Sequence, residues 1–317
     1  MRKLWNGKID SFEEDDLKLW QVVKDISEVQ EKGGVCFVGY DTEDGILRDE
    51  GVVGAAEGAD AIRKGLSELP GIKNLRIYDY GNLEKKTLEE AQEEYSEKIA
   101  DIYSKGLFPI GLGGGHDIVY GAYKGIRKAF PDKKIGIISF DAHLDIKSYD
   151  ERMTSETSFK KILDEDKNVE YAITGFQRLE NSRSLIRNAD EKGVLVLEEE
   201  YPEEFTISSL KSFVKKMDIV YVTICMDVFD GSAAPGVSFP TVLGMDSKKG
   251  RRILRALMET KKVVCLDFAE INPRYDVANR TSRLAGYMIY ETMEKLVDMY
   301  RFTKWFDKIE KNILFSF

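Results

Sequence analysis

The two histidines of this 317-residue chain each lie in a short segment that can bind a metal ion. His116 lies in the sequence GGGHD, and His143 lies in the sequence DAHLD. Imidazole together with carboxylates suits Mn²⁺ and related ions, whereas a set rich in thiolates suits Zn²⁺. In an extended chain Asp141, His143 and Asp145 would point the same way, because alternate side chains share a face. These segments predict a hydrolytic centre with two cations, which would make a bridging water acidic enough to yield hydroxide at neutral pH.

Two further acidic segments follow apolar runs later in the chain. Cys225-Met226-Asp227 ends one run, and Glu270 in the sequence AEINP follows another. Cys225 indicates an unusual centre, because sulfur is a softer metal ligand than oxygen. The carboxylate of Glu270 could pair through both oxygens with a planar cation of the guanidinium or amidinium type. An ordinary surface glutamate at the end of a strand is the alternative.

The three glycines before His116 have two interpretations. They could form a phosphate-binding loop, or they could let the backbone approach the metal cleft closely. No lysine follows at the spacing of a phosphate loop, which favours the second interpretation. Asp117 is expected to cap a helix that begins near Ile118. Asp267 is either a partner of the site residues or a turn residue.

The elements that must position these residues follow from short apolar runs that alternate with longer amphipathic stretches. The apolar runs predict strands over residues 35–40, 74–78, 108–112, 135–140, 170–175, 194–197, 219–225 and 263–268. The amphipathic stretches predict helices over residues 59–69, 88–105, 118–130, 182–192, 208–216, 247–259 and 278–301. This alternation indicates a parallel, doubly wound sheet, in which ligands bind at the carboxyl ends of the strands. Each chemical segment directly follows a predicted strand, so we expect four loops to converge on one cleft.

Composition argues against several kinds of protein. The net charge of −9 argues against a nucleic-acid partner, which would need a basic surface. Cys36, Cys225 and Cys265 have no disulfide spacing, which favours a reducing cytoplasm. The first 16 residues lack the apolar core of a signal peptide. No apolar run approaches the roughly 18 residues that span a membrane. We therefore expect a cytoplasmic protein without a membrane partner.

Together these motifs resemble the ureohydrolase superfamily of arginase, agmatinase and formimidoylglutamase. The resemblance runs from about residue 35 to residue 290 and rests on GGGHD, SFDAHLD, MDVFDGSAAPGVSFP and AEINP. The segments GAAEGADAIRKGL, GFQRLENS and APGVS are most similar to the formimidoylglutamase branch. The resemblance implies an arginase-like three-layer α/β/α sandwich around a mostly parallel, doubly wound sheet. We expect a single domain over 1–317, with an N-terminal extension over 1–33 and a C-terminal tail over 304–317.

The resemblance also implies a binding role for each motif residue and a pair of Mn²⁺ ions. The implied ligands of one ion are His116, Asp141, Asp145 and Cys225. The implied ligands of the other are Asp141, His143, Cys225 and Asp227. Asp145 would position the metal-bound water, and Glu270 would hold the formimino or guanidino group. The implied reaction is attack of hydroxide on an amidine carbon, which converts formimidoylglutamate to glutamate and formamide in histidine degradation.

The chain departs from the family pattern at three places. Cys225 stands where the family has an aspartate that bridges both metals, and a thiol cannot supply two hard oxygens. Glu156, in the sequence TSET, stands where the branch has glycine, and its negative charge could obstruct an anionic substrate. Asp49 and Val52 replace an asparagine and an arginine at the mouth of the cleft. These departures indicate altered or weakened chemistry, or a different substrate.

Two kinds of protein remain open on the sequence alone. The first is a metal-dependent hydrolase of linear C–N bonds that acts on a small amidine or guanidine, with formimidoylglutamate as the first choice. Its substrate-binding candidates besides Glu270 are Lys147, Ser155 and Asn181, with the surface cations Arg152, Arg178 and Arg183 as further options. The second is a non-catalytic binding or regulatory protein that keeps the fold with one metal or none. The apolar tail could pack on the body of the protein or on a neighbouring subunit of a homo-oligomer.

Overall fold

The computed structural model describes residues 4–149 and 152–299 of the chain. They contain one nine-stranded parallel sheet with the strand order β1-β3-β2-β4-β9-β8-β5-β6-β7. The strands are β1 (Lys24–Asp25), β2 (Val35–Tyr40), β3 (Ile77–Asn82), β4 (Phe108–Gly113), β5 (Ile135–Phe140), β6 (Val169–Phe176), β7 (Leu195–Glu198), β8 (Ile219–Cys225) and β9 (Val263–Ala269). The parallel, doubly wound sheet expected from the sequence is confirmed.

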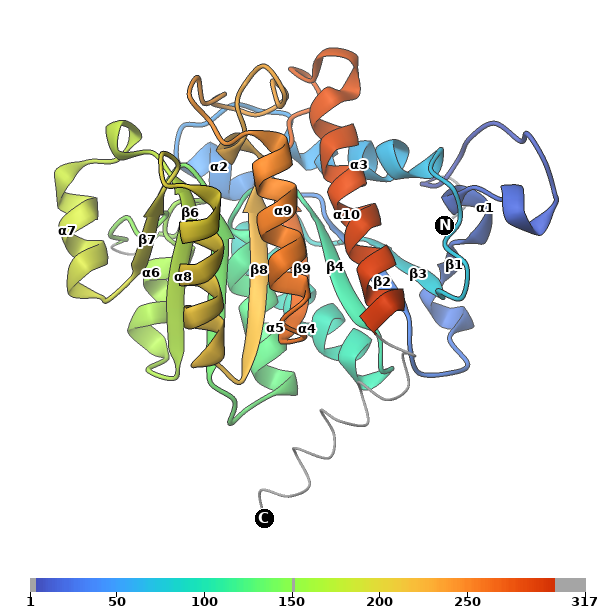
Figure 1. Cartoon of the computed structure of the whole chain (residues 1–317), viewed down its shortest axis with the longest axis horizontal. Helices are drawn as coiled ribbons and strands as arrows, with labels where there is room; N and C mark the ends of the chain where they lie inside the picture. The colour runs from blue at the N-terminus through green and yellow to red at the C-terminus, as the bar shows by residue number, and fades with distance from the viewer. Residues whose placement is uncertain (1–3, 150–151, 300–317) are drawn as a thin grey trace.

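Helices cover both faces of this sheet, which gives the three layers of the expected sandwich (Figure 1). The helices are α1 (Leu19–Val22), α2 (Asp44–Arg48), α3 (Gly58–Ser67), α4 (Leu88–Ser104), α5 (Ile118–Ala129), α6 (Ser158–Glu165), α7 (Arg183–Glu191), α8 (Glu203–Lys215), α9 (Ser247–Met258) and α10 (Arg280–Met299). On one face the helices lie side by side in the order α8, α9, α10 and α3. On the other face α4, α5 and α6 lie side by side. Within the described residues, no helix combines the length and apolar character needed to cross a membrane.

The central strands form where the sequence is apolar on both faces. Every residue of β2, β5 and β8 is buried, which matches their runs VCFVGY, IGIISF and IVYVTIC. Their predicted limits agree with the structure to the residue. The strand expected over 74–78 instead spans Ile77–Asn82. Its second half is polar, and the buried Asp79 obscures the apolar pattern.

The first part of the chain, expected as an extension over 1–33, adds an edge strand to the sheet. In this part β1 pairs with β3, and the buried indole of Trp5 donates a hydrogen bond of 2.6 Å to Asp79 Oδ2. The expected tail over 304–317 lies outside the described residues. The limits of a single domain over 1–317 therefore stay a prediction.

A buried ion pair joins α3 to β3. The Arg63 side chain, which is 0% exposed, donates through Nε to Asp79 Oδ2 at 2.7 Å and through Nη2 to Asp79 Oδ1 at 3.0 Å. Its Nη1 donates to Asn82 Oδ1 at 2.5 Å. Because both charges are buried, each depends on the other for compensation.

We expect Arg63→Met to lower the free energy of unfolding by about 3–5 kcal/mol, because it leaves the Asp79 carboxylate buried without its cation. Urea unfolding followed by tryptophan fluorescence would measure the change. The double variant Arg63→Met, Asp79→Leu should recover much of the loss, since it removes both charges together. A single variant as stable as the parent would show that the pair contributes little.

Candidate metal centre

Four neighbouring strands bring the predicted site residues to one edge of the sheet. Strands β4, β9, β8 and β5 lie side by side in that order, and all run parallel. His116 follows β4, Glu270 follows β9, Asp227 follows β8, and the DAHLD segment follows β5. The loops after these strands leave from the upper edge of the sheet in Figure 1. The expected convergence of four loops on one site is confirmed by the ligand distances below.

The first potential ligand cluster consists of His116, Asp141 and Cys225. One ligand atom from each of these buried side chains lies within 4.8 Å of the others. His116 Nδ1 lies 3.0 Å from Asp141 Oδ2 and 2.8 Å from Asp145 Oδ2. The Cys225 side chain is only 2% exposed and faces this cluster at the end of β8.

The second potential ligand cluster consists of Asp141, His143 and Asp227, again with ligand atoms within 4.8 Å of one another. His143 Nδ1 lies 3.6 Å from Asp141 Oδ1 and 3.4 Å from Asp227 Oδ2. Asp141 belongs to both clusters and presents one carboxylate oxygen to each histidine. It is therefore placed to bridge two cations.

The outer nitrogens of both histidines are held by residues that sequence reasoning missed. His116 Nε2 lies 3.0 Å from Thr223 Oγ1, and this hydroxyl donates to Asp267 Oδ1 at 2.5 Å. The Thr223 oxygen therefore accepts from Nε2–H, which leaves Nδ1 of His116 facing the carboxylates. His143 Nε2 lies 3.2 Å from Glu180 Oε2. Such partners fix the ring orientation of metal-binding histidines. Asp267 is therefore a partner of the site residues, through Thr223, and not a turn residue.

The carboxyl groups of the clusters are crowded and incompletely paired. The buried atoms Asp141 Oδ2 and Asp227 Oδ1 make no hydrogen bond. Burial and the charge of Asp141 raise the pKa of Asp145 to about 7. Burial, followed by the charges of Asp141 and Asp227, raises the pKa of the Cys225 thiol well above its usual range. The unpaired oxygens and the raised pKa values have one cause: negative charge is buried here without enough positive charge beside it. Divalent cations would supply that positive charge.

The DAHLD loop does not stay extended over 141–145, which was the condition for its alternate side chains to share a face. Asp141 Oδ1 accepts from the backbone N–H of His143 at 2.8 Å, as in an Asx turn. Asp145 has a φ of 49°, in the left-handed region that non-glycine residues rarely adopt. The turn lets Asp145 contact His116 while His143 faces Asp227.

Glu270 lies beside the clusters and is held by the backbone of the His116 loop. Its Oε1 accepts from the backbone N–H of His116 at 2.8 Å, and its own N–H donates to Gly114 O at 2.8 Å. Its φ of 64° is also left-handed, so the carboxylate is held in place by a strained backbone. Glu270 is buried and does not belong to either ligand cluster.

The expected cap of α5 by the Asp117 side chain is wrong. Asp117 occupies the position before the helix but makes no side-chain cap bond. The hydroxyl of Tyr40 donates to its carboxylate instead. Asp117 therefore ties the His116 loop to β2 from inside the core.

Three residues at the rim form a charged group that involves two of the sequence departures. Lys147 Nζ lies 2.5 Å from Glu156 Oε2 and 3.4 Å from Asp49 Oδ2. Burial and a hydrogen bond with Glu156 raise the pKa of Asp49 to about 7. The cation expected to meet a substrate carboxylate is thus already paired within the protein.

The other two rim candidates, Ser155 and Asn181, make hydrogen bonds that hold loops together. The backbone N–H of Ser155 donates to Gly45 O at 3.1 Å, and its side chain is mostly buried. Asn181 Oδ1 accepts from Leu144 N at 3.0 Å, and its Nδ2 donates to Ala142 O at 2.8 Å. These bonds give Asn181 a role in shaping the DAHLD loop, and the substrate contact expected for it stays a prediction.

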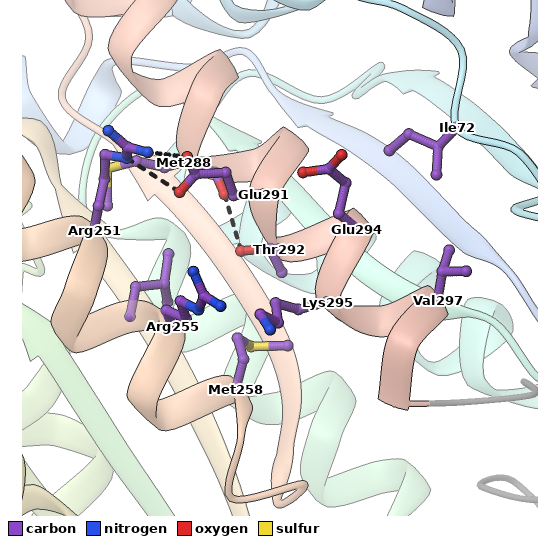
Figure 2. A pocket seen from close by; sticks show the side chains of 11 residues that line it. Ile72, Arg251, Arg255, Met258, Met288, Glu291, Thr292, Glu294, Lys295 and Val297 are labelled. Carbon is purple, nitrogen blue, oxygen red and sulfur yellow. Dashed lines mark hydrogen bonds and ion pairs between the residues drawn. The ribbon is translucent and has the colours of Figure 1, made fainter.

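A separate cavity of about 410 Å³ lies between α9 and α10 (Figure 2). Arg251 and Glu291 form an ion pair on its wall, and Met258 and Met288 give it an apolar side. Because α9 ends just before β9 begins, this cavity lies toward the amino edge of the sheet. It contains none of the predicted site residues.

Comparisons with known proteins find a matching family, similar sequences and similar folds. The model of the arginase family matches residues 34–294. A formimidoylglutamase of Fusobacterium nucleatum is 38% identical over 93% of the chain and 98% of the relative, and one of Lysinibacillus sphaericus is 37% identical over 93% and 97%. The crystal structure of formimidoylglutamase from Bacillus subtilis has a TM-score of 0.82 at 20% identity, covering 92% of this chain and 94% of that one. Trypanosoma cruzi formiminoglutamase with Mn²⁺ has a TM-score of 0.79 at 24% identity, covering 89% and 98%.

Proposed function

Because the chain belongs to the arginase family, we propose that it hydrolyses N-formimidoyl-L-glutamate to L-glutamate and formamide with the help of two divalent cations. Its formimidoylglutamase relatives, which match over nearly their whole length, support this substrate. The observation that carries the proposal is the position of Asp141 between two clusters, each with its own histidine. A site built this way can hold two cations around one shared carboxylate.

The proposed ligands fit such cations by their chemistry and by their lack of other partners. The oxygens of Asp141 and Asp227 that make no hydrogen bond would gain a partner on metal binding. Asp145, which lies beside His116, would complete the first set. Bound cations would lower the pKa of water enough for hydroxide to be available at neutral pH. The thiol of Cys225 fits Mn²⁺ less well than the aspartate it replaces.

The remaining chemistry falls to residues of the chain itself. Glu270 would hold the planar formimino group through a charge-assisted hydrogen bond and so orient its carbon toward the clusters. Asp145 would accept a hydrogen bond from the attacking water and take up its proton. The water oxygen bonds to the formimino carbon, and the bond from that carbon to the glutamate nitrogen breaks. The nitrogen leaves with a proton as the amine of glutamate, and the other product is formamide.

A formamide-release assay on protein with measured metal content would test the proposal. Formimidoylglutamate is the first substrate, and agmatine and arginine are the controls. We expect turnover of formimidoylglutamate at full metal load and loss of turnover after chelation. Fully loaded protein that releases neither formamide nor urea from any of the three compounds would instead favour the non-catalytic binding protein.

One observation favours a second candidate substrate within the same reaction class. Lys147 at the rim is paired with Glu156 and Asp49. An unpaired lysine at this place would instead be able to bind a substrate carboxylate. A guanidino or amidino compound with a neutral or cationic far end would meet less repulsion there. Agmatine in the assay represents this class.

We expect Glu156→Gly to lower the KM for formimidoylglutamate, because it releases Lys147 to meet a substrate carboxylate. The pair is partly exposed to solvent. Pairs of this kind contribute at most about 1 kcal/mol, so the change in KM should be about fivefold or less. Steady-state kinetics would measure it.

Two further variants separate charge from size in this experiment. Glu156→Gln removes the charge but keeps the bulk and should give a similar gain. Adding Lys147→Ala to Glu156→Gly should cancel the gain, because the released cation is then absent. An unchanged KM in both single variants would show that Glu156 does not oppose the substrate.

A further inference from the structure

The two ligand clusters differ in one donor atom, and that atom is a sulfur. One cluster offers a nitrogen, an oxygen and the sulfur of Cys225, while the other offers a nitrogen and two carboxylate oxygens. Thiolates favour Zn²⁺ and other soft ions, whereas carboxylates suit Mn²⁺. Zn²⁺ is commonly held by a small set of cysteine, histidine and carboxylate ligands.

Cys225 is positioned by the sheet to act as a donor rather than as a core residue. It is the last residue of β8, and its sulfur lies within 4.8 Å of a potential ligand atom of His116 and one of Asp141. Cys36 and Cys265 lie within β2 and β9, are fully buried, and belong to neither cluster. The two histidines also have separate supports, Thr223 for one and Glu180 for the other.

We propose that the His116–Asp141–Cys225 cluster is more selective for Zn²⁺ over Mn²⁺ than the Asp141–His143–Asp227 cluster, because only the first offers a sulfur donor. This inference rests on the ligand set in the proposed function, but it does not depend on the substrate. It gives the replacement of a bridging aspartate by Cys225 a chemical consequence other than loss of the metal.

Competitive metal binding would test the inference. Metal-free protein is dialysed against equal concentrations of Mn²⁺ and Zn²⁺, and the bound metals are counted by mass spectrometry. Most nitrogen and oxygen sites already bind Zn²⁺ more tightly than Mn²⁺. The informative quantity is therefore the change in the bound Zn²⁺ to Mn²⁺ ratio between the parent and Cys225→Asp. We expect this variant to lower the ratio at least about tenfold, while Cys265→Ala, the matched control on β9, leaves it unchanged.

A spectrum of the Co²⁺-loaded parent gives a second readout that needs no variant. Thiolate ligation produces a sulfur-to-cobalt charge-transfer absorption in the near ultraviolet, which nitrogen and oxygen ligands do not produce. We expect this band in the parent and in Cys265→Ala, but not in Cys225→Asp or Cys225→Ser. A parent without the band, or a metal ratio unchanged in a folded Cys225→Asp, would overturn the inference. Protein that shows the band but releases no formamide would overturn the proposed function alone.

Discussion

Asp141→Asn should abolish hydrolysis and remove bound metal from both clusters. Asp141 is the one residue shared by the two clusters, and each of its oxygens faces a different histidine. The amide of asparagine lacks the negative charge and offers only one oxygen as a ligand. The expected loss of transition-state stabilisation is about 4 kcal/mol or more, which is about a 10³-fold loss in kcat/KM.

Metal content and steady-state kinetics on the same preparation would measure both parts of this result. Asp190→Asn, an identical chemical change at an exposed position of α7, is the matched control and should match the parent. Circular dichroism would confirm that both variants are folded. A folded Asp141→Asn protein that still binds two equivalents of metal would show that Asp141 does not bridge the clusters.

Glu270→Gln should have the second largest effect, and it should act on the substrate rather than on the metal. Glu270 belongs to neither ligand cluster, yet its buried carboxylate lies next to the His116 loop. Glutamine keeps the size and can still accept the bond from the His116 N–H, but it lacks the charge that would hold an amidinium group. A charge-assisted hydrogen bond contributes about 1.5–3 kcal/mol. We therefore expect kcat/KM to fall about 10- to 200-fold with metal content unchanged.

Paired metal analysis and kinetics distinguish the two roles of Glu270. Glu97→Gln, at an exposed position of α4, serves as the matched control. If metal and activity are lost together in Glu270→Gln, Glu270 is a ligand and its assignment to the substrate is wrong. An effect on KM alone would indicate that Glu270 binds the substrate and the transition state equally strongly.

The central fold could be predicted from the sequence because its strands are apolar on both faces. This holds for β2, β5 and β8, whose limits were predicted to the residue. The limits of β3 were missed because Asp79 is buried by its pairing with Arg63, which no local pattern reveals. Helices α2 and α6 and strand β1 were not predicted. The two helices are too short to show a clear apolar period, and β1 has only two residues.

The site was predictable to the extent that its residues lie at strand ends. His116, His143 and Glu270 could be placed there from the apolar runs before them. Thr223 could not, because it lies inside a fully buried strand in which the sequence does not mark the face toward the site. The group of Lys147, Glu156 and Asp49 also joins loops far apart in the chain, and only the folded structure brings them together.

The strand order also has a consequence for how the chain folds during synthesis. Strands β4 and β5 follow each other along the chain, yet β9 and β8 lie between them in the sheet. Until residue 269 has been made, the sheet can exist only as separate parts with unpaired edges at its future centre. Such edges invite pairing with other chains, and contacts as distant as Ile110 with Leu266 form slowly. The loops of the candidate metal centre belong to strands on both sides of this gap, so we expect the newly made protein to be prone to aggregation until this centre has formed.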